Sequence, residues 1–127
     1  MKLLMTLLPI LIIFPAVLQA QQKEPVGCTK GEVAGAVLQF KKDAENGTIK
    51  LYTLSGLQPL PLEDESVFTK KYATSFHDFG CVAPANLSYY RNYNLQVFEY
   101  LNSEFGTSWQ KELPPGIIGW QHYKETN

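Results

Sequence analysis

The segment from Leu87 to Phe105 constrains the fold of this chain more than any other segment. Its apolar residues recur every four positions, a spacing that gathers side chains on one face of an α-helix. The repeating residues are Tyr89, Tyr93, Val97, Leu101 and Phe105, with Tyr90, Phe98 and Tyr100 beside them. Asn86 or Ser88 can cap such a helix, and Gly106 can end it. We therefore predict a long helix over 87–105, against which the rest of the chain must pack.

A second helix is predicted near the start of the folded region. Thr29 and Glu32 have the spacing of a capping box, in which each side chain accepts a hydrogen bond from the other residue's backbone N–H. The apolar residues that follow recur at helical intervals: Val33, Val37, Phe40 and Ala44. Gly47 suits the left-handed conformation that ends many helices. The pattern predicts a helix from about residue 30 to residue 45.

A shorter helix is predicted further along the chain. The run Glu63-Asp64-Glu65 places negative charge at its start, and Lys70-Lys71 places positive charge near its end. Both choices suit the helix dipole. Phe68 and Tyr72 are one turn apart, so they share a face of this helix.

Two segments are predicted to be strands. Residues 48–54 and 75–82 are rich in residue types that favour extended structure. Because the short helix separates them, the simplest arrangement is a parallel β-α-β crossover, and a longer antiparallel route is the alternative.

The end of the chain is expected to hold short elements. Thr107 and Gln110 have capping-box spacing and open a helical turn through Leu113, which Pro114-Pro115-Gly116 then breaks. Residues 117–123 are expected to form a last strand, and residues 124–127 a tail.

Together these elements predict an α+β fold. A single small domain over residues 29–123 would pack three to four helices on a sheet of two or three strands. The residues expected in its core are Val33, Val37, Phe40, Ile49, Leu51, Phe68, Tyr72, Phe79, Tyr93, Val97, Leu101, Phe105 and Trp109.

The first 20 residues are typical of a secretory signal peptide. A basic start, an apolar run over 3–17 and a small residue at Ala20 follow one another. We expect cleavage near Ala20 and export to the periplasm or beyond, with a flexible arm over 21–28. The apolar run is shorter than the ~20 residues that span a bilayer, so no membrane span is expected in the mature chain. Gly27-Cys28 resembles a lipoprotein processing site, but residues 21–25 separate it from the apolar run.

The charge of the chain argues against nucleic acid as a partner. Its formal net charge is −1. Proteins that bind nucleic acid or anionic lipid through charge carry a basic surface, and this composition does not supply one. The sequence does not set the oligomeric state.

The two cysteines, Cys28 and Cys81, are expected to form a disulfide in an oxidising compartment, and two separate thiols are the alternative. A thiol enzyme would need Cys81 unpaired, with His77 or His122 as its base. The spacing of these cysteines and histidines does not match that of zinc ligands. We expect no metal and no cofactor.

Carboxylates suggest only a weak catalytic alternative. The cluster at 63–65 is accounted for by the start of a helix. Asp78 with Glu99 or Glu104 would resemble the pair of a glycosidase, but their spacing does not require it. The sequence lacks both the serine elbow of hydrolases and a phosphate-binding glycine loop. We therefore assign no catalytic residue.

Aromatic side chains are dense in the second half of the chain. They can fill the core, or they can form a binding face, because Tyr and Trp are favoured at interaction hot spots. The candidate surface residues are Tyr90, Tyr100, Trp120 and Tyr123.

The second half of the chain resembles the FEKKY domain. Phe68-Thr69-Lys70-Lys71-Tyr72 is similar to the motif that names this family, with Thr69 in place of its Glu. The likeness covers about residues 68–119 through an ordered series: Phe79-Gly80-Cys81, Tyr93-Asn94, Val97-Phe98, Tyr100-Leu101, Phe105-Gly106, Trp109 and Glu112. The resemblance implies a small exported domain of the kind found in Bacteroidetes-like bacteria, and it carries over no catalytic residue.

These observations favour a non-catalytic exported interaction module that binds a protein or an envelope component. The alternatives are a small exported enzyme, using Cys81 or a carboxylate pair, and a purely structural accessory module.

Overall fold

The chain alternates helices and strands in its first half and is helical in its second. The structure, a computed structural model, describes residues 29–58 and 61–127. Its elements are α1 (Lys30–Asn46), β1 (Lys50–Thr53), α2 (Leu62–Tyr72), β2 (Ser75–Asp78), α3 (Leu87–Phe105), the 3-10 helix η1 (Ser108–Lys111) and α4 (Trp120–Thr126). The three predicted helices are confirmed. The predicted leader and flexible arm lie outside the described residues.

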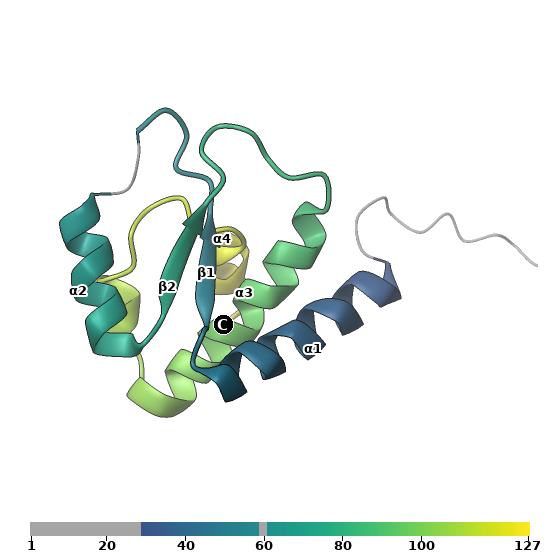
Figure 1. Cartoon of the computed structure of the whole chain (residues 1–127), viewed down its shortest axis with the longest axis horizontal. Coiled ribbons are helices and arrows are strands. Elements are labelled where there is room, and N and C mark those ends of the chain that lie inside the picture. The colour runs from purple at the N-terminus through teal and green to yellow at the C-terminus, as the bar shows by residue number, and fades with distance from the viewer. Residues whose placement is uncertain (1–28, 59–60) are drawn as a thin grey trace, which may run out of the picture.

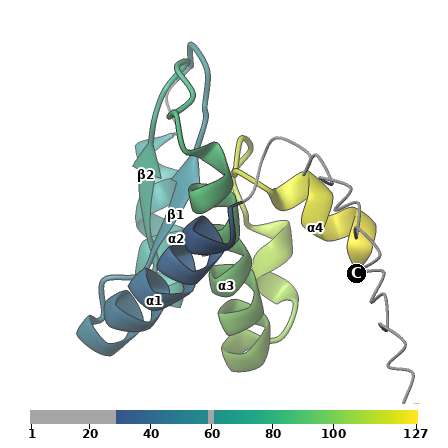
Figure 2. The ribbon, with the colours of Figure 1, turned by 90° about the vertical axis from the view of Figure 1, so that its right-hand side faces the viewer.

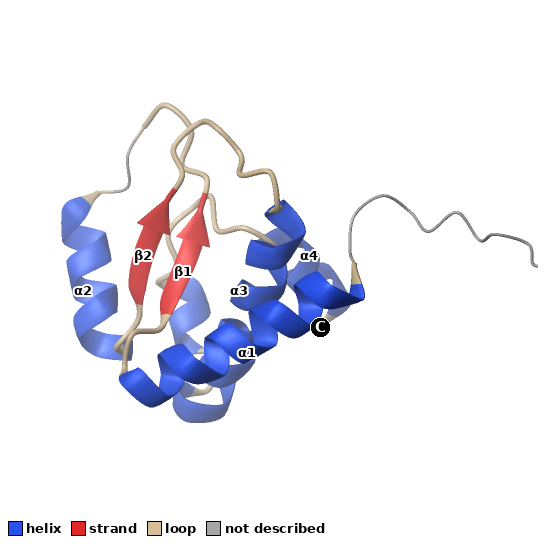
Figure 3. Ribbon diagram, turned by 45° about the vertical axis from the view of Figure 1, so that its right-hand side comes forward, coloured by secondary structure: helices blue, strands red, loops and turns tan. Residues whose placement is uncertain are grey.

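β1 and β2 form a parallel pair, with Leu51 opposite Phe76 and Thr53 opposite Asp78. Since α2 connects them, the predicted β-α-β crossover is confirmed (Figure 1). Both strands are shorter than predicted, because Thr48 bonds back to the end of α1 and the chain turns after Asp78. Helices flank this small sheet on both sides, so the predicted α+β class is confirmed (Figure 3).

α3 is the centre of the fold. It packs against α1, β1 and η1, and its face of Tyr93, Val97, Phe98 and Leu101 is fully buried. In Figure 1, α2 lies beside β2, whereas α1 and α3 lie on the side of β1. Figure 2 shows α4 on the far side of α3 from the strands.

The segment after η1 runs back along β1 and departs from the sequence prediction. Ile118 donates its N–H to the Tyr52 carbonyl at 3.1 Å, and Thr53 forms an isolated antiparallel bridge with Ile117. α4 then begins at Trp120, so the predictions of a strand over 117–123 and a tail over 124–127 are wrong. Trp120 and Tyr123 stand three positions apart and both contact Phe98, which is the helical spacing that the prediction overlooked.

The helix caps were predicted with mixed success. At α1, the N–H of Glu32 donates to the Thr29 hydroxyl and the N–H of Thr29 donates to the Glu32 carboxylate, so the capping box is confirmed. At α3, Asn86 makes no side-chain cap bond, and Ser88 instead donates to Glu32 at 2.7 Å. Thr107 makes no cap bond either, so the second capping box was wrong.

The core holds most of the predicted residues. Val33 and Phe105 are exceptions, at 36% and 38% exposed, because they lie at the edges of their helix faces. Val37, Phe40 and Phe79 are half-buried. The buried residues that the pattern did not single out are Ala36, Tyr52, Phe98, Ile117, Ile118 and Tyr123.

Candidate functional site

Asp78 fastens together the two loops that leave the carboxyl ends of the strands. Its Oδ1 accepts hydrogen bonds from the Thr53 hydroxyl at 3.1 Å and from the N–H groups of Ser55 (3.1 Å) and Gly80 (2.9 Å). The Ser55 hydroxyl donates to Oδ2, and the Gly56 N–H donates to the Gly80 carbonyl at 3.1 Å. This end of a parallel sheet is where ligand-binding loops are usually placed, and here the loops are held in one arrangement.

The hydrogen bonds to Asp78 also fix its charge. Desolvation raises the pKa of this carboxyl, but the donors of Ser55, Gly80 and Thr53 outweigh it and lower the pKa to about 2. A carboxylate occupied by four donors is poorly placed to transfer a proton. Glu99 and Glu104 lie in the second half of α3, which runs away from the carboxyl ends of the strands (Figure 1). The structure therefore does not bring together the carboxylate pairs considered from the sequence.

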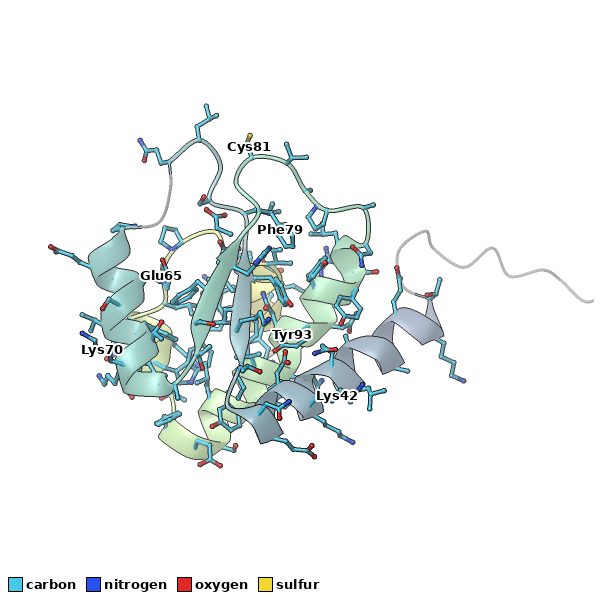
Figure 4. The ribbon with its side chains drawn as sticks, in the orientation of Figure 1. Lys42, Glu65, Lys70, Phe79, Cys81 and Tyr93 are labelled. Atoms are coloured by element: carbon cyan, nitrogen blue, oxygen red, sulfur yellow. The ribbon has the colours of Figure 1, made fainter. Side chains whose placement is uncertain are left out.

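The two loops expose apolar side chains. Leu57, which follows β1, is 92% exposed, and Val82, which follows β2, is 73% exposed. Cys81 is exposed at the tip of the second loop (Figure 4). Large apolar side chains held in water by ordered loops are typical of surfaces that contact another molecule.

Aromatic rings support these loops from below. Phe79 and Tyr90 pack with ring centroids 4.8 Å apart, and both contact the buried ring of Tyr52. Tyr89 packs edge-on against Tyr90 at 5.2 Å. Phe79, Tyr89 and Tyr90 are half-buried, so part of each ring faces solvent. We call Leu57, Phe79, Val82, Tyr89 and Tyr90 the loop-end surface.

The tyrosines at this end stay neutral over a wide range of pH. Burial raises the pKa of Tyr52 to about 12, and the nearby Tyr89, Tyr90 and Asp43 raise it further in the same direction. Burial also raises the pKa of Tyr89. The loop-end surface therefore combines apolar groups with uncharged hydroxyl groups.

Cys81 and His77 lie at the same end of the molecule. The exposed His77 ring packs against Phe79 at 4.7 Å and against Tyr52 at 5.5 Å, an aromatic environment. Cys28 lies outside the described residues, so the disulfide stays a prediction. Over the described part of the chain, no group of three or more His, Cys, Asp or Glu side chains could hold a metal ion.

The other predicted surface aromatics are scattered. Tyr100 is half-buried against Phe40, with centroids 6.0 Å apart, and so packs toward α1. Trp120 and Tyr123 pack against α3 from α4, their centroids 5.7 Å apart. Tyr123 is only 5% exposed, so its prediction as a surface residue is wrong: its ring closes the contact with Phe98. Only Tyr90 belongs to the loop-end surface.

The residues of the FEKKY-like motif on α2 join that helix to the rest of the fold. Phe68 and Tyr72 are buried with centroids 4.6 Å apart, and Tyr72 meets Phe105 at 5.1 Å. Lys71 pairs with Glu112 at 2.5 Å, and this hydrogen bond raises the pKa of Lys71 and lowers that of Glu112. Lys70 is exposed on α2.

The later residues of the resemblance also have structural positions. Asn94 is buried and bonds β1 through its side-chain amide, and Trp109 is buried and stacks on Phe98 at 5.8 Å. Tyr93 donates to Asp43 at 2.6 Å, while Gly80 and Gly106 have positive φ at turns. These residues hold the fold, so the binding surface must be sought elsewhere on the molecule.

Comparison with known proteins adds no family: no family model, curated protein or solved structure matches this chain. Among residues 29–58 and 61–127, no helix has both the length and the apolar character needed to cross a membrane.

Sequence reasoning missed Leu57 and Val82. Neither lies in a periodic pattern, because loop residues have no repeating face. The available signal was an isolated large apolar residue within a segment of turn-forming residues, as in Ser55-Gly56-Leu57.

Proposed function

We propose that this chain is an exported, non-catalytic interaction module that binds a protein of the cell envelope through its loop-end surface. The observation that carries the proposal is the exposure of Leu57 and Val82 on loops that Asp78 holds in place. The signal-like leader and the resemblance to the FEKKY domain support an exported setting.

Binding is favoured over catalysis because the polar side chains with catalytic potential already have structural partners. Asp78 accepts four hydrogen bonds at the loops. Asp43, at 6% exposed, accepts from Tyr93 at 2.6 Å and from Gln39 at 3.0 Å inside the fold. A carboxylate buried in this way stabilises its neighbours and does not reach a substrate.

A protein partner is favoured by the composition of the loop-end surface. Two aliphatic side chains, a phenylalanine and two neutral tyrosines lie together there. Interaction hot spots have this mixture of aromatic anchors and apolar contacts with few charges. Because the loops are already ordered by hydrogen bonds, less conformational entropy is lost when a partner binds.

Capture of partners by tagged mature protein, with light crosslinking in envelope and secreted fractions, tests the proposal. The double variant Leu57→Ser with Val82→Ser should lose the captured partner, since both side chains lie in solvent and their replacement leaves the core intact. The matched control is Leu38→Ser with Val67→Ser, which changes two side chains that are 55% and 61% exposed on α1 and α2. Equal capture by both double variants would contradict the proposed surface.

A further inference from the structure

A separate pocket lies between α3, η1 and α4. It has a volume of about 400 Å³, and its walls include Glu99, Asn102, Gln110, Trp120, Tyr123 and Lys124. This volume falls within the range of small-molecule sites. The pocket involves the second half of α3, whereas the loop-end surface lies where α3 begins.

Asn102 organises the polar side of this pocket. Its Oδ1 accepts hydrogen bonds from Trp109 Nε1 at 3.0 Å and from Gln110 Nε2 at 3.2 Å, and its Nδ2 donates to the Tyr123 hydroxyl at 2.6 Å. Burial and the neighbouring Glu99 raise the pKa of Tyr123, so the hydroxyl keeps its proton and hydrogen-bonds Glu99. A continuous network thus runs from the buried Trp109 to Glu99 at the surface and sets the side chains before any ligand arrives.

Aromatic rings form the other side. The rings of Trp120 and Tyr123 are inclined by only 23°, and Trp120 is half-buried. Lys124 places its Nζ 5.8 Å from the centre of the Trp120 ring. Because Lys124 is an exposed and flexible side chain, a ligand can displace it and take its place on the ring.

We propose that this pocket binds a neutral carbohydrate of one or two sugar rings. Planar amide and carboxylate groups such as those of Gln110 and Glu99 can each bond neighbouring sugar hydroxyls, while a flat aromatic ring suits the C–H face of a sugar. The opposite charges of Glu99 and Lys124 balance, which favours an uncharged ligand over an ion. This site is independent of the loop-end surface.

Tryptophan fluorescence gives a direct readout, because Trp109 and Trp120 are the two tryptophans of the chain and both lie at this pocket. Mature protein is titrated with cellobiose, chitobiose and maltose up to about 10 mM, a range that detects millimolar binding. We expect a saturable change in emission with at least one of the three. The double variant Leu57→Ser with Val82→Ser should keep this response, which separates the pocket from the proposed protein-binding surface.

Two substitutions on the walls test the residues involved. Glu99→Gln and Gln110→Ala should each weaken the sugar about tenfold, the effect of losing one useful hydrogen bond. Glu104→Gln is the matched control on the same helix and should bind as the unaltered protein does. Trp120 is left intact in this test because it also packs against Phe98. The proposal is overturned if none of the three sugars gives a saturable change, or if Glu99→Gln and Gln110→Ala both bind as tightly as the control.

Discussion

Asn94 joins three parts of the backbone from inside α3. Its Oδ1 accepts the Tyr52 N–H at 2.9 Å, and its Nδ2 donates to the carbonyls of Tyr52 and Ile118 at 2.8 and 2.9 Å. The side chain therefore takes the place of a neighbouring strand for β1. It is fully buried, so water cannot replace these bonds.

Asn94→Ala should lower the free energy of unfolding by roughly 2–4 kcal/mol, since it leaves buried backbone groups without partners. Denaturant unfolding measures the loss. Gln96→Ala on the same helix is the control and should change stability by about 0.5 kcal/mol or less. If the two variants unfold at the same denaturant concentration, Asn94 does not hold β1 as described.

Asp78 predicts a pH dependence at the residue scale. Its pKa is lowered from 3.8 to about 2 in the folded protein, so its stabilising effect is present above pH 4 and is lost as the pH falls toward 2. Asp78→Asn removes this titration. The difference in unfolding free energy between the unaltered protein and this variant should therefore shrink from pH 4 to pH 2. A difference that stays constant over this range would rule out the proposed charge state.

At the scale of elements, Gly116 allows the last segment to lie against β1. Its φ is +83°, and a Cβ there would stand 2.7 Å from the Leu54 carbonyl oxygen. This carbonyl is backbone that cannot swing away. Gly47, which ends α1 at φ +67°, has open space around the same position.

Gly116→Ala should therefore cost more stability than Gly47→Ala. We expect roughly 2–4 kcal/mol for the first, from strain together with the clash, and about 1 kcal/mol for the second, from strain alone. Thermal unfolding of the two variants provides the comparison. Equal losses would mean that the segment at 116–118 yields easily and is not held against β1.

The sequence predicted those elements whose periodicity is long enough to define a face. α3 has the bounds that its four-residue repeat indicated, and α1 begins at its capping box. The short elements failed, because a few residues such as Trp120 and Tyr123 fit strand and helix alike until their contact with Phe98 decides. The burial of Tyr52 is also a tertiary effect, since the residues that cover it come from α3 and from the segment near Ile118.

The same reasoning explains what could be predicted of the candidate site. Tyr90 was identified because it flanks the regular face of α3. Leu57 and Val82 were not, because exposure in a loop depends on the hydrogen bonds of Asp78, which sequence spacing does not reveal. The FEKKY-like residues that stood out in the sequence proved to be packing residues.

At the scale of the whole molecule, α3 separates two proposed binding sites. The loop-end surface lies where the helix begins, and the aromatic pocket lies along its second half. The helix is about 28 Å long at 1.5 Å per residue, which leaves room for two ligands at once. This arrangement would suit a module that contacts a protein and a glycan of the same envelope.

The predicted disulfide also belongs to this scale, since it would tie the segment before α1 to the loop after β2. In mature protein from an oxidising compartment, a maleimide should label Cys81 only after reduction. Cys28→Ser should make Cys81 reactive without reduction, because its sulfur is exposed. The bridge would stabilise the fold by roughly 4 kcal/mol in the chain-entropy model. Labelling of both cysteines in untreated protein would show two separate thiols.

Site-specific crosslinking in cells tests the central claim most directly. A photocrosslinking side chain is placed at position 57 in the loop-end surface and, separately, at position 38 on the exposed side of α1. The account predicts one discrete crosslinked protein from position 57 and none from position 38. No adduct from position 57, or the same adducts from both positions, would contradict a binding role for the loop-end surface.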